Sequence, residues 1–102
     1  MNSNMDPVKT GQNIKKYRKR KGLSVREVSR KLNLNATQSV YKWERGQNVP
    51  RVDNLFALCY ILEVSPMDIC VFYDENYAKK IHQVLQKVVD RNDLKEGGKL
   101  VL

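Results

Sequence analysis

The sequence has few of the residues that build metal centres and disulfide frameworks. It contains two cysteines and one histidine among 102 residues. Two thiols and one imidazole do not complete a four-ligand zinc site, and two cysteines are too few for the disulfide scaffold of a small secreted protein. We therefore predict no metal and no other cofactor, and we interpret Cys59 and Cys70 as reduced, small core residues.

The motifs of the common enzyme classes and of membrane proteins are also missing. The sequence has no glycine-rich phosphate loop, no cysteine close to its single histidine and no acidic cluster suited to a metal ion. No apolar run approaches the roughly 20 residues that a membrane-spanning helix needs. Residues 1–7 do not resemble a signal peptide and are expected to form a flexible tail. We therefore predict a cytoplasmic, nucleoid-associated protein that is not an enzyme and does not contact a membrane.

Acidic residues are scarce in the first half of the chain. Residues 8–51 contain 13 Lys or Arg against 2 acids, a balance of +11, whereas residues 52–102 contain 6 basic and 8 acidic residues. Such asymmetry favours a polyanion-binding surface in the first half. The alternative is a solvated face that only keeps the protein in solution.

Helix start and stop signals predict an all-α fold. Gly22 and Gly46 are placed to end two helices, and Ser24 with Glu27 forms a capping box that starts a third. Asn33, which tolerates the left-handed conformation, lies in the turn that follows. The predicted helices cover about residues 10–21, 24–32, 36–45, 52–62, 66–72 and 74–91.

Apolar residues recur at helical spacing and predict a single core. Leu55, Leu58, Cys59 and Leu62 lie at i, i+3, i+4 and i+7, which makes residues 52–62 the most apolar helix and the expected centre of the core. The other inward positions are expected to be Ile14, Tyr17, Val28, Leu32, Val40 and Trp43.

The predicted helix over residues 36–45 is short and polar on its outer side. The major groove of B-DNA, about 12 Å wide, admits one such helix. Four residues opposite the inward pair are expected to read bases: Thr37, Gln38, Tyr41 and Lys42. Phosphate contacts are expected from Lys15, Lys19, Ser24, Arg26, Ser39, Arg45, Asn48 and Arg51. For the lysines of the first helix, the alternative is again a merely solvated face.

The ordered set of these residues resembles the lambda-repressor/Cro-like (XRE-type) helix-turn-helix family. The matching residues are Ile14, Arg18, Gly22-Leu23-Ser24, Val28, Leu32, Val40, Trp43-Glu44-Arg45-Gly46, Pro50, Leu55, Leu58, Leu62, Val64-Ser65 and Ile69. The resemblance implies a five-helix lambda-repressor-like DNA-binding domain over residues 8–72, in which the third helix reads bases. It also implies an inward salt bridge between Arg18 and Glu44.

The sequence departs from the family pattern at three points. Val25 stands where the family usually places a glutamine that fixes a phosphate, and Arg26 is expected to replace that contact. Ser29 stands in place of a frequent alanine. The turn before the third helix is one residue longer than the commonest spacing, which affects the angle of that helix.

Residues 73–102 are predicted to add a C-terminal amphipathic helix and a flexible tail, which begins near Leu94. The helix carries one apolar face, formed by Tyr77, Ile81, Val84, Leu85, Val88 and Val89. This face either packs on the same domain or meets a second copy or a partner protein. In the tail, the apolar residues 100–102 are expected to extend such an interface.

Together these features predict a bacterial transcription regulator, with repression as the expected sign. One helix-turn-helix unit reads only a few base pairs, so we expect a homodimer on a palindromic operator in double-stranded DNA. The alternative function is that of an antitoxin or other protein-interaction module, whose C-terminal helix binds a partner protein.

Overall fold

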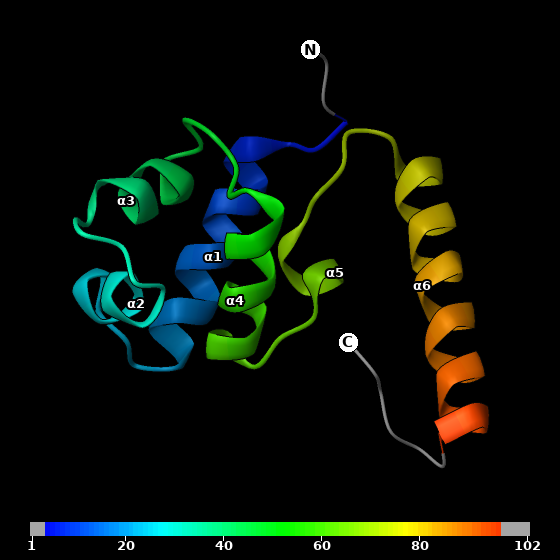
Figure 1. The fold of residues 1–102 in the computed structure, drawn as a ribbon. Helices are drawn as coiled ribbons and strands as arrows, with labels where there is room; N and C mark the ends of the chain where they lie inside the picture. The colour runs from blue at the N-terminus through cyan, green and yellow to red at the C-terminus, as the bar shows by residue number, and fades with distance from the viewer. Residues whose placement is uncertain (1–3, 97–102) are drawn as a thin grey trace.

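The protein is all-helical in a computed structural model that describes residues 4–96, with the side chains of residues 4–87 (Figure 1). Within that part of the chain, six α-helices follow one another, and an isolated antiparallel bridge pairs Met5 with Phe72. The helices are α1 (Pro7–Arg20), α2 (Val25–Lys31), α3 (Gln38–Glu44), α4 (Val52–Leu62), α5 (Pro66–Ile69) and α6 (Glu75–Glu96).

The helix ends follow the capping chemistry of the sequence. Ser24 and Glu27 form a reciprocal capping box at the start of α2. Gly22 and Gly46 adopt φ of 71° and 76° just after α1 and α3, where glycine pays no Cβ penalty. The start of α1 differs from the sequence-based prediction, because the Asp6 carboxylate accepts hydrogen bonds from the Val8 and Lys9 amides and starts the helix at Pro7.

Two residues other than glycine adopt the left-handed conformation among the described residues. Asn33 has φ of 58° in the turn after α2, as the sequence predicts, and Glu63 has φ of 56° at the end of α4. Glycine or asparagine usually marks such a helix end, so the sequence carries no signal for the turn at Glu63. The turn between α2 and α3 extends to Thr37, and α3 starts at Gln38, one or two residues later than expected.

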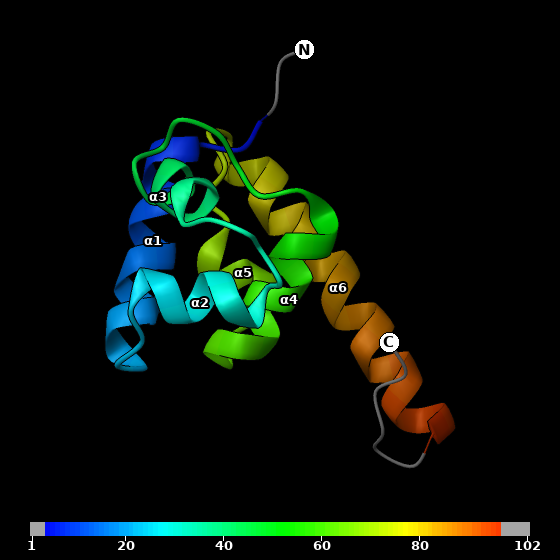
Figure 2. The ribbon, with the colours of Figure 1, turned by 60° about the vertical axis from the view of Figure 1, so that its left-hand side comes forward.

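The core lies where α1 to α5 meet. Its most deeply buried apolar side chains come from all five helices, and Val28, Val40, Leu58 and Ile69 are each 0% exposed. The other buried members are Ile14, Val25, Trp43, Cys59 and Leu62. Packed around this core, α3 contacts both α1 and α2 (Figure 2), so these contacts hold α3 at the surface of the domain.

The segment before α1 is paired with the segment before α6. The Asp6 amide donates to the Val71 carbonyl at 2.7 Å, and the Tyr73 amide donates to the Asn4 carbonyl at 2.8 Å. Residues 4–7 therefore differ from the expected flexible tail, because these hydrogen bonds and α1 hold them in place. The first three residues of that predicted tail lie outside the described residues.

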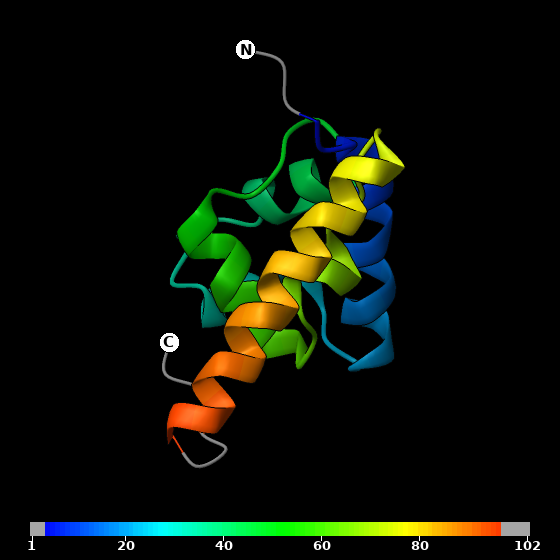
Figure 3. The same ribbon diagram turned by 90° about the vertical axis from the view of Figure 1, so that its right-hand side faces the viewer.

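Helix α6 stands on the side of the domain opposite α3 (Figure 1, Figure 3). Asp74 caps its first turn, because the carboxylate accepts from the Asn76 amide at 2.9 Å. The helix continues to Glu96, so residues 94–96 are helical where a tail was expected. The side chains of Val88 and Val89, and the remaining tail residues 97–102, lie outside the described part.

Candidate nucleic-acid interface

Helix α3 separates a buried face from an exposed polar face. Val40 is 0% and Trp43 is 5% exposed, so both side chains point into the core. Gln38, Tyr41 and Lys42, three of the four residues expected to read bases, are exposed on the other side of the helix. The fourth, Thr37, is half-buried at the N-cap and makes no capping hydrogen bond with its side chain. The helix therefore presents hydrogen-bonding side chains on a surface that the core fixes from behind.

Close backbone contacts fix the end of α3 against α1. A Cβ atom added at Gly11 would lie 2.1 Å from the Trp43 carbonyl oxygen. One added at Gly46, where φ is also positive, would lie 2.7 Å from the Val8 Cα. Only glycine allows so close an approach without a backbone shift. These two contacts set how far α3 stands out from the domain.

A buried ion pair joins α1 to the last turn of α3. Arg18 Nε lies 2.6 Å from Glu44 Oε2, and Nη2 lies 3.0 Å from Oε1. The third guanidinium nitrogen, Nη1, donates to the Leu23 carbonyl at 2.9 Å. The hydrogen bond to Glu44 raises the pKa of Arg18, against the opposing effect of burial. This pairing uses the Glu44 carboxylate, so its negative charge is neutralised beside the exposed polar face of α3.

Two predicted phosphate contacts lie at the start of α2. The Ser24 hydroxyl accepts from the Glu27 amide at 3.0 Å, and the Ser24 amide donates to Glu27 Oε1 at 3.0 Å. The hydrogen bonds from Ser24 lower the pKa of Glu27. Ser24 thus has a structural role as a cap, while the neighbouring Arg26 side chain is exposed.

Most of the other predicted phosphate contacts are exposed around α3. The Arg45 guanidinium lies over the Tyr41 ring, 5.4 Å from its centroid, so a predicted phosphate contact and a predicted base reader are brought together. Lys15 and Lys19 are exposed on α1, whereas Asn48 and Arg51 are exposed between α3 and α4. Ser39 is half-buried.

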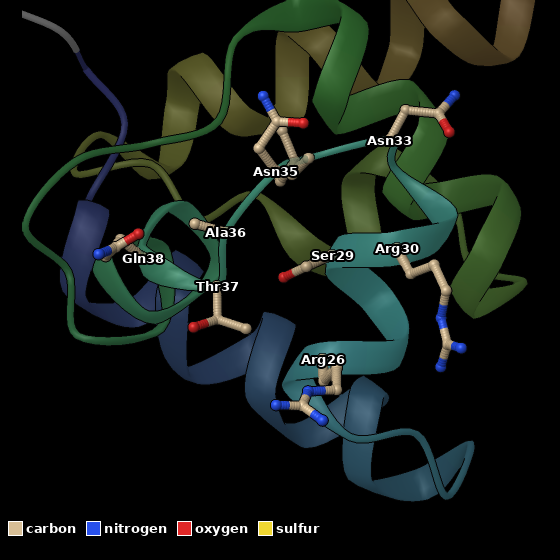
Figure 4. Close-up of a pocket in the computed structure, with 9 residues that line it drawn as sticks. Arg26, Ser29, Arg30, Asn33, Asn35, Ala36, Thr37 and Gln38 are labelled. Atoms are coloured by element: carbon tan, nitrogen blue, oxygen red, sulfur yellow. The ribbon is translucent and has the colours of Figure 1, made fainter.

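An open hollow lies between α2 and the start of α3 (Figure 4). Its lining includes Arg26, Thr37 and Gln38, so the structure brings together one predicted phosphate contact and two predicted base readers. Arg30 and Ser29 line the same hollow and were not singled out as DNA contacts from the sequence. Helical spacing could have pointed to them, because residues 26, 29 and 30 lie on the same side of a helix, so both are neighbours of the predicted contact Arg26.

Sequence reasoning also missed the polar residues that orient α1. Thr10 is 1% exposed, and its hydroxyl accepts from the Val71 amide at 3.0 Å. The Asn13 amide group donates to the Ile69 carbonyl at 3.1 Å. Thr10 and Gly11 lie one turn before the apolar Ile14, and this spacing of small residues beside a core position is the signal for a close helix contact.

The described residues contain no group of three or more His, Cys, Asp or Glu side chains that could hold a metal ion. Both cysteines are buried and free. Burial raises the pKa of the Cys59 thiol to about 11 and also raises the pKa of Cys70, so both thiols are neutral at physiological pH. Over the same part of the chain, no helix has the length and apolar character to cross a bilayer.

Comparison with known proteins gives a family match and several similar structures. A profile of the helix-turn-helix family matches residues 14–69. Comparison with curated proteins gives no match. The restriction-modification controller protein C.AhdI from Aeromonas hydrophila is 31% identical, with 63% of this chain and 96% of that chain covered and a TM-score of 0.58.

Two structures of the regulator SinR are also similar. The master regulator for biofilm formation SinR, solved in complex with DNA, is 34% identical over 56% of this chain and 90% of that chain, with a TM-score of 0.51. A chain of the SinR–SinI protein complex is 26% identical over 85% of this chain and 88% of that chain, with a TM-score of 0.57.

Proposed function

The chain belongs to the lambda-repressor/Cro-like helix-turn-helix family of DNA-binding transcription regulators, and from this premise we propose that it represses transcription as a homodimer on a palindromic operator. In this proposal α3 enters the major groove of each half-site. An operator that overlaps a promoter is then closed to polymerase while the dimer occupies it. The family is non-enzymatic, and the comparisons favour a regulator over an antitoxin or another protein-interaction module.

The observation that carries the proposal is the division of α3 into two faces. Val40 and Trp43 anchor the helix, which leaves the amide of Gln38 and the ammonium of Lys42 exposed on the other side. Gln pairs with adenine and Lys with guanine in the major groove. We therefore assign base reading to Gln38, Tyr41 and Lys42 with Thr37 at the edge, and backbone contacts to the exposed basic residues around them.

Enrichment of bound duplexes from a randomised pool tests the proposal directly. At about 150 mM salt, where non-specific binding is weak, we expect a palindromic motif with half-sites about 10 base pairs apart. Gln38→Ala and Lys42→Ala are each expected to cost about 1–3 kcal/mol at particular base pairs. A sequence-independent loss from Gln38→Ala would remove its reading role, and no enriched motif at all would contradict specific binding.

A lysine on α1 and a lysine on α6 can be compared to separate a phosphate contact from a general effect of net charge. Lys19→Ala on α1 is expected to weaken binding to all duplexes alike and to reduce the salt slope by about one. Lys79→Ala removes an exposed lysine from α6, on the side opposite α3. It is expected to leave both affinity and salt slope near those of the original chain, and equal losses from both variants would show that only net charge matters.

The exposed apolar face of α6 supports the homodimer part of the proposal. Tyr77 is 44%, Val84 is 59% and Leu85 is 41% exposed, and these residues share one side of the helix. An exposed apolar face of this kind marks an interaction site. A two-fold related copy of the same face is the simplest cover, because a palindromic site requires two copies of α3.

Light scattering coupled to gel filtration tests this interface. Val84→Glu combined with Leu85→Glu is expected to convert a dimer into a monomer and to weaken operator binding. Gln83→Glu is the matched control, because Gln83 is an exposed polar residue of the same helix. Phe56→Glu tests a second exposed apolar position, on α4. Loss of the dimer in that variant alone would move the interface away from α6, and a monomeric original chain would favour a partner protein.

A further inference from the structure

The hollow between α2 and the start of α3 is lined mainly by side chains that can donate hydrogen bonds, together with Leu34 and Ala36, and by no acidic residue (Figure 4). Arg26 and Arg30 contribute guanidinium groups, Ser29 and Thr37 contribute hydroxyls, and Gln38 contributes a side-chain amide. Guanidinium groups are always charged and accept no hydrogen bonds. The lining therefore has the chemistry of a site for an anion with several acceptor oxygens.

A buried hydroxyl in this hollow has no partner within the part of the chain that the structure describes. Ser29 is 3% exposed, and its Oγ makes no hydrogen bond there. In Figure 4 this oxygen points into the gap between α2 and α3, on the side of Thr37. Leaving a buried hydroxyl unpaired is costly, and most such groups in proteins have a partner. The hydroxyl is thus free to donate to a group that enters the gap.

The position of the hollow indicates which anion enters it. A helix is about 10–12 Å across with its side chains, which is nearly the full width of the major groove at about 12 Å. An element packed beside a helix in the groove must therefore face the sugar-phosphate backbone at its edge. Here that element is α2, whose Arg26 side chain lines the hollow together with Thr37 (Figure 4).

We propose that the gap between α2 and α3 holds one backbone phosphate of the bound DNA, with Arg26 as its charged partner and the buried Ser29 hydroxyl as an inner donor. This inference rests on the proposed insertion of α3 in the major groove. Thr37 then donates to the same phosphate and positions the first turn of α3. Arg30, whose guanidinium is turned outward along α2 in Figure 4, reaches the neighbouring phosphate.

Ser29→Ala separates a binding role from a structural role. If the hydroxyl is only a buried residue, removing it leaves DNA affinity unchanged. If it donates to a phosphate, affinity for every duplex falls about ten- to 150-fold, the range for a hydrogen bond to a charged group. In both cases the variant is expected to melt at the same temperature as the original chain or higher, because an unpaired polar group is lost from the core. A Ser29→Ala variant that binds DNA more weakly but melts at the same temperature or higher would therefore support the phosphate-binding role.

Arg26→Ala and Lys31→Ala form a matched pair on the same helix. Arg26→Ala is expected to lower affinity about tenfold and to reduce the salt slope by about one. Lys31 is exposed and lines a different depression, beside Cys59 and Tyr60. Its removal is expected to change affinity by less than about twofold, because charges away from the contact are screened by salt.

Duplexes that carry a single methylphosphonate, which is neutral, locate the phosphate. The original chain is expected to lose affinity at one step in each half-site. Ser29→Ala and Arg26→Ala are expected to lose less at that step than at the others, because the partner of the phosphate is already absent. Losses that simply add at every step would overturn the proposal.

The remaining outcomes separate this inference from the proposed function. An original chain that enriches an operator while Ser29→Ala and Arg26→Ala bind it unchanged would overturn the phosphate site alone. An original chain that enriches no operator would overturn both. Inorganic phosphate is added as a third arm. If it raises the melting temperature of the original chain but not of Ser29→Ala in the absence of DNA, while both variants bind the operator unchanged, the hollow holds a free anion, and the DNA assignment is overturned.

Discussion

Helices α4 and α6 both carry apolar residues at helical spacing, yet among the described side chains only those of α4 are fully buried. Leu58 is 0% and Leu62 is 2% exposed on α4, whereas Val84 is 59% and Leu85 is 41% exposed on α6. Helix α4 lies among four other helices, and α6 stands beside them. Apolar residues at helical spacing therefore predict a helix and its apolar face. They do not predict what covers that face, which depends on where the helix lies in the fold.

The largest effect that separates the two helices is expected from shortening one buried and one exposed side chain. Leu58→Ala is expected to cost about 2–5 kcal/mol of unfolding free energy, since it leaves a cavity in the core. Val84→Ala on α6 is expected to change the unfolding of the monomer by less than about 0.5 kcal/mol. Urea unfolding at low protein concentration measures both, and similar losses would mean that α6 packs on the domain in solution.

The next effect compares a buried ion pair with an exposed one. Glu44→Gln is expected to cost about 3 kcal/mol, because it leaves the Arg18 guanidinium buried without its counter-charge. The control is Glu63→Gln, which breaks the pair that Lys21 and Glu63 form at 2.6 Å, where the Glu63 side chain is 74% exposed. Thermal unfolding should show a large decrease for the first variant and almost none for the second. Equal decreases would contradict the burial of Arg18.

A smaller effect is expected from the buried Cys59 thiol of α4, whose pKa reports how well water is excluded from that face of the helix. Burial raises the pKa of Cys59 from 9.0 to about 11. A thiol with a raised pKa in the folded state stabilises the fold below pH 9.0, and this contribution is lost as the pH rises through about 11. The difference in stability between the original chain and Cys59→Ala is therefore expected to shrink over that range. A difference that stays constant would mean that water reaches the thiol.

The smallest effect is expected at the capping box of α2, on the exposed surface. The Ser24 hydrogen bonds lower the pKa of Glu27 below its usual value of 4.5. Its contribution is therefore present above pH 4.5 and is lost as the pH falls through the lowered value. The pH dependence of melting in the original chain and in Glu27→Gln measures this. A variant with the same acid dependence as the original would show that the carboxylate adds nothing to the cap.

The local features of the fold could be predicted from the sequence because each depends on residues close together in the chain. Ser24 and Glu27 form the predicted capping box, and Asn33 adopts the predicted left-handed turn. The start of α1 was misplaced because Asp6 was not considered as a cap, and α6 was cut short because the apolar period ends at Val89, although Gly97 directly follows the last helical residue. Glu63 shows the limit of such signals, since a residue without turn preference adopts φ of 56°.

The candidate site was accessible from the sequence in its chemistry but not in its geometry. Helical periodicity placed Gln38 and Lys42 on the exposed face of α3. It did not reveal that Gly11 lies against the Trp43 carbonyl, or that Ser29 is buried with an unpaired hydroxyl facing Thr37. Both facts depend on how two helices meet in space, which spacing along one helix does not encode. The DNA-contacting roles themselves remain predictions for the binding experiments.

The pairing of Asn4 and Asp6 with Tyr73 and Val71 also has a kinetic consequence. It joins segments that lie at the two ends of the folded domain, so its closure spans a long loop and is slow compared with helix formation. These hydrogen bonds are therefore expected to form after the helices have assembled and to open first in the native state. In hydrogen exchange, the Asp6 and Tyr73 amides should lose protection by local opening, well before the amides of α4 exchange through global unfolding.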